Sequence, residues 1–505
     1  MFRQLEKEFS SFESSRKNFV RMIAESASRA ENIKHLLDLN VLSVLRFLLL
    51  DNVSSVQQSA ALAIGRLANY DQAVAERIVS IGILPDIVNG LSSEDLCYQK
   101  HSCFVLRTIS KHSSELAEMV VNHDALEPLV SCLQSYDVKV RESAGAALGS
   151  IAMHAPDLAK AVLDAQAAPL LITACQDSEP SLKKIAITAL GDIAKHSSDM
   201  AQALIDENAI TIISPYLNDP DSKLRQATAL TLSHIAKHSV QSAELVVNSG
   251  IFPAVLLCFK DKDQVVRKNA AGLIREVVKH TQELSQRVVT EGGGAALVQF
   301  LKPDQNNEPL FGVMSIGYIA SFSQALSSVL IQCGAPEVVL NVFVQSKSDQ
   351  TKSAAAWALG QLGKHTSDTS SNLSNLQVLS LLLEEHNKTE SSIDLKQKTE
   401  KAMYLIIQKC TNIEALQCLI DKAPQTILEY VLEQISKLIP KNLKMRVPFI
   451  QSGGFAAVQR VQTSVGTKIK EYVDIINGCY PEQAVKYYSP QCNGALIQEI
   501  ENYGH

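Results

Sequence analysis

The sequence predicts an all-α solenoid made of helical repeats about 42 residues long, and two observations lead to this fold class. The first is a recurring signature, best seen in 224–250, in which a long apolar run is followed by Lys-His, a hydroxyl residue and a second apolar run. The second is composition, since 46% of the 505 residues are apolar but only 5% are aromatic. A fixed period of this size is typical of stacked helical repeats. The marker position recurs at steps of 42 residues, with a last step of 43, at Tyr70, His112, His154, His196, His238, His280, Phe322 and His365.

Three helices are predicted in each repeat, as in the segments 114–124, 125–135 and 138–154. A side chain able to cap the first helix follows the marker position at Ser113, Ser197, Ser239, Thr281, Ser323 and Thr366. That helix is expected to end at a residue that tolerates the left-handed conformation. The predicted ends are Gly82, Asp124, Gln166, Asn208, Gly250, Gly292 and Gly334. Of these, Gln166 fits the left-handed conformation poorly. Three helices in about 42 residues are the armadillo arrangement and not the two-helix HEAT unit. We therefore expect a right-handed armadillo-repeat superhelix.

The repeats are bounded by two segments that lack the period. Residues 1–27 are predicted to form one amphipathic capping helix, because Phe2, Leu5, Phe9, Phe12 and Phe19 follow helical spacing. Armadillo repeats are predicted over 28–410, degenerate helical repeats over 411–470 and a distinct tail over 471–505. The charged start does not resemble a signal peptide, and the apolar runs are too short to span a membrane. We expect a soluble intracellular protein without membrane insertion.

No pattern in the sequence points to catalysis, a cofactor or a metal. The six in-register histidines would have to meet across repeats that stack roughly 8–10 Å apart, whereas zinc holds its nitrogen ligands within about 2.1 Å. Each histidine is instead predicted to close a helix C-terminus, partly as a cation. The glycines of 291–294 lack the Lys-Ser/Thr of a phosphate loop. A net charge of −6 offers no general field for nucleic acid, and ten scattered cysteines favour a reducing compartment.

The third helix lines the concave face of an armadillo solenoid, so its polar residues are the candidates for partner binding. The first basic row, thirteen residues before the marker position, is Arg141, Lys183, Arg225, Arg267 and Lys352. The second basic row, directly before the marker position, is Lys111, Lys195, Lys237, Lys279 and Lys364. These rows would suit an acidic partner such as the tails of tubulin, or they are solvated charges at helix ends. Both interpretations stay open. Tyr480, Tyr487 and Tyr488 are further candidates in the tail.

A comparison with nuclear-import adaptors counts against a role in cargo import. Those adaptors carry a Trp, and an Asn four residues later, on successive third helices. Here the Trp position is occupied by Leu62, Phe104, Ala146, Thr188, Leu230, Gly272, Met314 and Trp357. The Asn position is occupied by Arg66, Thr108, Ser150, Asp192, His234, Glu276, Tyr318 and Gln361, without one Asn. The ladder that clamps an extended basic peptide is therefore missing.

Several strings resemble one family, among them 61–70, 274–286, 354–366 and above all the 476–490 segment INGCYPEQAVKYYSP, which no repeat period demands. On these strings the chain resembles the sperm-associated antigen 6 family of armadillo-repeat proteins, over essentially its whole length. Departures from the pattern are Phe322, where the repeat expects His, the polar stretch 384–394, and residues 491–493.

The resemblance implies a non-enzymatic scaffold in the central apparatus of the ciliary and flagellar axoneme. Its partners would be the central-pair microtubules and other central-apparatus proteins, and it would be required for the integrity of that cytoskeletal structure and for cell and sperm motility. A cytoplasmic pool would exist before assembly. From the capping helix and the tail we also predict self-association. The alternative is a soluble armadillo adaptor in signalling or nuclear transport, and the chain leaves no room for a separate catalytic domain.

Overall fold

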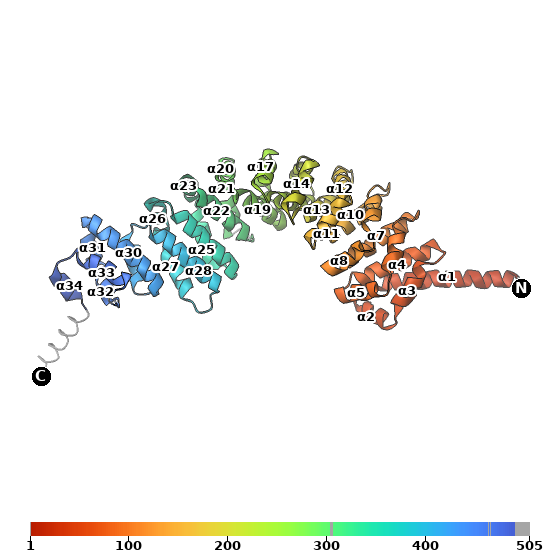
Figure 1. Cartoon of the computed structure of the whole chain (residues 1–505), viewed down its shortest axis with the longest axis horizontal. Helices are drawn as coiled ribbons and strands as arrows, with labels where there is room; N and C mark the ends of the chain where they lie inside the picture. The colour runs from red at the N-terminus through yellow and green to blue at the C-terminus, as the bar shows by residue number, and fades with distance from the viewer. Residues whose placement is uncertain (1, 304–306, 463, 465, 490–505) are drawn as a thin grey trace, which may run out of the picture. The chain divides into compact units, whose positions relative to one another are not determined.

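The computed structural model describes residues 2–303, 307–462, 464 and 466–489, and within these ranges every regular element is a helix. The all-α prediction is therefore confirmed. The part of the tail beyond Ser489, including residues 491–493, lies outside the described residues. The chain forms two compact units, an N-terminal unit of residues 1–258 and a C-terminal unit of residues 259–505. In each unit the helices stack in chain order (Figure 1).

The third helices form the continuous row of each unit, because each packs on the third helix of the next repeat. In the N-terminal unit they are α4 (Ser54–Ala68), α7 (Leu96–Ser110), α10 (Val138–Ala152), α13 (Pro180–Ala194) and α16 (Ser222–Ala236). In the C-terminal unit they are α19 (Gln264–Val278), α22 (Leu310–Phe322), α25 (Asp349–Gly363), α28 (Ile393–Ile407), α30 (Gln425–Lys441) and α33 (Lys468–Asn477).

Shorter first and second helices cover the third helices. The first helices are α2 (Ala30–Asp38), α5 (Gln72–Ser80), α8 (Ser114–Val121), α11 (Pro156–Asp164), α14 (Ser198–Asp206), α17 (Val240–Asn248), α20 (Gln282–Thr290), α23 (Gln324–Gln332), α26 (Ser367–Asn375) and α31 (Arg446–Gln451). The second helices are α3 (Val41–Leu49), α6 (Leu84–Gly90), α9 (Leu126–Cys132), α12 (Ala167–Cys175), α15 with η1 (Ala209–Ile213, Ser214–Asn218), α18 (Phe252–Cys258), α21 (Gly293–Phe300), α24 (Ala335–Gln345), α27 (Val378–Asn387), α29 (Ile413–Ile420) and α32 (Gly454–Arg460). The remaining elements are α1 (Phe2–Ser26), η3 (Leu443–Met445) and α34 (Glu482–Tyr488).

Local chemistry sets the helix ends. The predicted caps are confirmed: Ser113, for example, accepts a hydrogen bond from the backbone N–H of Leu116 at 3.2 Å, and Ser197 does the same for Met200 at 3.3 Å. An N-cap side chain of this kind satisfies one of the free N–H groups at a helix start. Gln166, which fits the left-handed region poorly, nevertheless adopts it with φ of 61°. The geometry of the repeat overrides the preference of this side chain.

The in-register histidines join neighbouring repeats. Nε2 of His112, His154 and His196 donates to the carbonyl oxygens of Ala68, Ser110 and Ala152, each at 2.7 Å. Each acceptor is the last residue of the preceding third helix, where no intrahelical donor remains. His238 and His365 make the same bond to Ala194 and Ala320. The prediction that each histidine closes a helix C-terminus is confirmed for these five, and the helix that each closes belongs to the preceding repeat. A partly cationic ring is not supported at His196, because burial lowers the pKa of its imidazole.

One repeat of the C-terminal unit is abbreviated. The third helices α28 and α30 begin 32 residues apart (425 − 393), whereas α10 and α13 begin 42 apart (180 − 138). In this repeat α29 lies beside α27 and α32, which are second helices. A first helix is therefore missing between α28 and α29. This explains why the 42-residue period is lost after residue 410, where degenerate repeats were predicted.

Candidate partner-binding surfaces

The first basic row contacts other parts of the solenoid. Arg141 forms an ion pair with Asp177 in the next repeat at 2.7 Å, and Lys352 does so with Glu385 at 2.7 Å. Nζ of Lys183 lies 5.2 Å from the ring centroid of Tyr216. Arg225 and Arg267 each donate from Nη1 to a carbonyl of the preceding turn, those of Asp219 and Asp261, at 2.6 Å. Arg141, Lys183 and Lys352 thus contact the next repeat, whereas these bonds of Arg225 and Arg267 brace the turn before their own helix.

The second basic row also binds backbone and side-chain oxygens. Nζ of Lys111 donates to the carbonyl of Asn69 at 3.0 Å, and Nζ of Lys364 to that of Ser321 at 2.7 Å. Burial lowers the pKa of both lysines, and the charge of Arg107 adds to this effect at Lys111. The other three contacts of the row are Lys195 to Asp192 at 3.0 Å, Lys237 to the carbonyl of Lys195 at 3.3 Å and Lys279 to Glu276 at 2.5 Å.

Two of the three candidate tyrosines hold the tail against the last repeat. The ring centroid of Tyr480 lies 4.4 Å from that of Phe455, which is fully buried, and its hydroxyl donates to the carbonyl of Arg446 at 3.2 Å. Burial raises the pKa of Tyr480 to about 12. Tyr488 packs on the same phenylalanine at 5.7 Å. Tyr487 is 61% exposed and is the member of this group that a partner can reach most easily.

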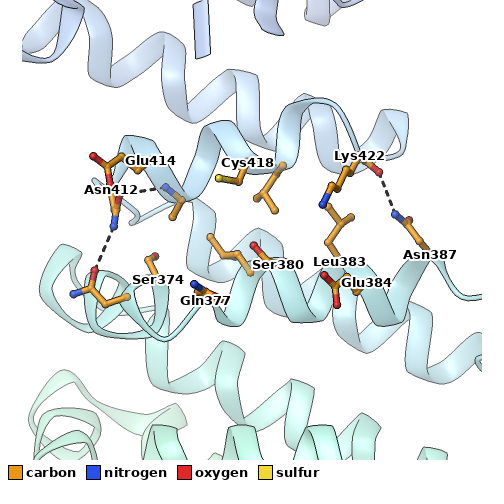
Figure 2. Close-up of a pocket in the computed structure, with 14 residues that line it drawn as sticks. Ser374, Gln377, Ser380, Leu383, Glu384, Asn387, Asn412, Glu414, Cys418 and Lys422 are labelled. Atoms are coloured by element: carbon orange, nitrogen blue, oxygen red, sulfur yellow. Dashed lines mark hydrogen bonds between the residues drawn. The ribbon is translucent and has the colours of Figure 1, made fainter. Parts of the chain in front are cut away.

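The abbreviated repeat opens a groove of about 510 Å³ between α27 and α29. Figure 2 shows the two helices side by side, with Ser380, Leu383 and Cys418 facing the space between them. Hydrogen bonds lie at both ends of the groove: Asn412, the N-cap residue of α29, donates to Asn375 at the end of α26 at 3.3 Å, and Asn387 of α27 donates to the carbonyl of Lys422 at 3.1 Å (Figure 2). Sequence analysis did not identify these residues. The signal that would have found them is the shortened spacing of the third helices.

Three comparisons with known proteins relate this chain to others. Residues 113–153 match the family model of the armadillo/beta-catenin-like repeat. The crystal structure of an engineered protein has the same fold, with a TM-score of 0.70 at 20% identity over 87% of this chain and 98% of that one. The chain has the armadillo-repeat solenoid fold.

Two curated relatives narrow this assignment. Sperm-associated antigen 6 from Homo sapiens and its counterpart from Mus musculus are each 44% identical to the chain over 159 residues. This match covers 32% of the chain and 31% of either relative, so it spans about a third of their length. Over that part the resemblance predicted from the sequence is confirmed, and the chain is similar to sperm-associated antigen 6 there.

The residues at equivalent positions of the third helices differ from repeat to repeat. Trp357, the one tryptophan of the chain, packs edge-on to Tyr318 at 5.0 Å between centroids and lines a pocket of about 400 Å³ with Met314. At the equivalent of Tyr318, Arg66 instead donates to the carbonyl of Ala24 at 2.6 Å. Such variation on a constant framework is what a protein-binding solenoid needs in order to distinguish partners.

Among the described residues no group of three or more His, Cys, Asp or Glu side chains is placed to hold a metal ion. No single described helix is both long and apolar enough to cross a membrane. Three bent pairs of consecutive helices, α11 with α12, α17 with α18 and α23 with α24, reach that length and apolarity together.

Proposed function

We propose that this armadillo protein is a non-enzymatic scaffold of the axoneme central apparatus in cilia and flagella. It binds the central-pair microtubules and neighbouring central-apparatus proteins, and the structure and motility of the flagellum depend on it. The observation that carries the proposal is the 44% identity to sperm-associated antigen 6. The relative's name associates it with sperm, and the strings 274–286, 354–366 and 476–490 extend the resemblance beyond one repeat.

The physical form of the protein supports a scaffold. Stacked repeats contact only their neighbours, so a solenoid offers surface in proportion to its length and can hold several partners at once. The candidate contacts are the two basic rows, together with Tyr480, Tyr487 and Tyr488. Most of these side chains also make contacts within the solenoid, which a partner would have to compete with or break. Tyr487 is 61% exposed, so a partner can contact it most easily.

Self-association is part of the proposal, and α1 supports it. This helix buries only Val20, Ile23 and Ala24 against the solenoid. Its first turns carry an apolar stripe in which Phe2 is 83% exposed, Phe9 65% and Phe12 61%. A second copy that covered this stripe would remove it from water, which favours stacking of copies along a filament.

The test is the location of a tagged copy in a flagellated cell, followed by detergent extraction of the axoneme. A signal retained along the axonemal midline supports the scaffold. The tag alone is the control and should be extracted completely. A signal confined to the cytosol or nucleus would reject the scaffold and favour the soluble adaptor in signalling or transport. Sedimentation as a monomer at micromolar concentration would reject self-association.

A further inference from the structure

The N-terminal unit has a hollow on its third helices that sequence analysis did not reveal. It has a volume of about 330 Å³ and is bounded by α7, α10 and α13. Its floor is made by Gly145, Ala146 and Gly149 of α10, the smallest side chains available. Phe104 and Leu230 occupy the position of Ala146 in other repeats. The hollow is therefore the space that a large side chain fills elsewhere.

Two cations border the hollow. Arg107 of α7 and Lys184 of α13 both line it, and both are exposed. The residues 42 positions before and after Arg107 are Gly65 and Gly149, which occupy the equivalent position in the neighbouring repeats. A third helix that carries arginine where its neighbours carry glycine presents a charge that stacking of the repeats does not require.

The charge of these two side chains is not used within the protein. Neither Arg107 nor Lys184 forms an ion pair or a side-chain hydrogen bond with any residue in the described part of the chain. The nearby carboxylates are already engaged: Asp192, which also lines the hollow, pairs with Lys195 at 3.0 Å, and Glu142 pairs with Lys139 at 2.9 Å. The hollow thus has a net positive border and an uncharged floor.

We propose that this hollow binds an extended acidic segment of a partner protein, rich in Asp or Glu. One carboxylate pairs with the planar guanidinium of Arg107, which can hold it through two parallel hydrogen bonds. A second carboxylate pairs with Lys184, and the segment's backbone passes over the floor, where small side chains permit close approach. Two cations on a chain of net charge −6 suit a short carboxylate-bearing peptide better than the dense phosphates of nucleic acid. The inference rests on the proposed scaffold role and names the class of partner that its concave face takes.

The test measures binding of a fluorescent deca-glutamate peptide to the full chain by anisotropy, at about 50 and 300 mM salt. The double variant Arg107→Gln/Lys184→Gln should bind at least about tenfold more weakly at low salt and lose most of its salt dependence. The matched control is Arg77→Gln/Lys160→Gln, which removes one exposed arginine and one exposed lysine from the first helices α5 and α11. It should bind like the parent.

A third variant, Ala146→Leu, fills the hollow without changing its charge. Leucine stands at this position in the repeats of Leu62 and Leu230, so the backbone accepts it. It should weaken peptide binding by several fold, with unchanged far-ultraviolet circular dichroism. The proposal is overturned if the parent does not bind the peptide, if the double variant binds like its control, or if the filled hollow binds like the parent. Because the assay uses purified protein, its result is separate from the axonemal test: a protein extracted from axonemes that still binds the peptide refutes only the scaffold.

Discussion

The bond between each histidine and the preceding repeat can be tested most sharply at His196. Its Nε2–H donates to the carbonyl of Ala152 at 2.7 Å. That carbonyl belongs to the last residue of α10, and the residue four positions later, which would otherwise donate to it, is Pro156, which has no N–H. His196→Ala therefore leaves the carbonyl of a fully buried alanine without its donor from the next repeat.

The size of the effect follows from this geometry. A lost hydrogen bond costs about 1 kcal/mol, and a buried acceptor left without a partner costs about 1–3 kcal/mol. His196 is only partly buried, so water will solvate the carbonyl in part. We expect a loss of about 1–2 kcal/mol, which is a factor of about 5–30 in the local opening equilibrium.

Hydrogen exchange read by mass spectrometry measures this opening repeat by repeat. Exchange should accelerate in peptides from α10 and α13 and stay unchanged in α4, because each repeat interacts only with its neighbours. His196→Gln, which keeps a donor of similar reach, should recover part of the loss. The control is His123→Ala: within the described residues the exposed side chain of His123 bonds only to the carbonyl of Met119 in the helix just before it, so its loss should cost less than about 0.5 kcal/mol. Equal acceleration in all repeats, or none in α10, would refute the inter-repeat role.

Three further predictions concern stability. Burial lowers the pKa of His101 to about 4, so on acidification the unfolded chain takes up a proton at this side chain before the folded protein does. The free energy of unfolding should therefore be unchanged above pH 6.5 and fall by about 1–2 kcal/mol as the pH drops toward 4. Thermal unfolding of His101→Leu should show a weaker dependence on pH. Gly360→Ala would place a methyl 2.9 Å from Cα of Ala402, so it should lower the free energy of unfolding in urea by about 1–3 kcal/mol. An unchanged free energy of unfolding would mean that α25 and α28 can move apart without cost. Lys352→Ala should cost about 1 kcal/mol in the same assay, because Glu385, which is 7% exposed, loses one ion pair but keeps its second with Lys388 at 2.7 Å. The double variant Lys352→Met/Glu385→Leu should recover most of that loss.

The repeat, its three helices and its caps were predictable because each depends on neighbours in sequence. Ser113 caps α8 through a residue three positions away, and Gly250 ends a first helix through its own φ of 76°. The acceptor of His196 lies 44 residues away, and the partner of Arg141 lies 36 away. Those pairings depend on how neighbouring repeats stack in space. The period gives the number of residues between repeats but not which side chains meet across them.

The candidate surfaces were harder to predict because they lie where the chain departs from its own pattern. A stacking position must repeat, since a larger side chain there pushes neighbouring third helices apart. A departure is tolerated where the adjacent helix makes room, as with Trp357, which lies over Gly317 so closely that a methyl on that glycine would meet the ring at 2.2 Å. Arg107 is accommodated in the same way by the small Ala146 across the hollow. Because these positions vary while the stacking positions repeat, the positions that break the register are where the partners of this protein should be sought.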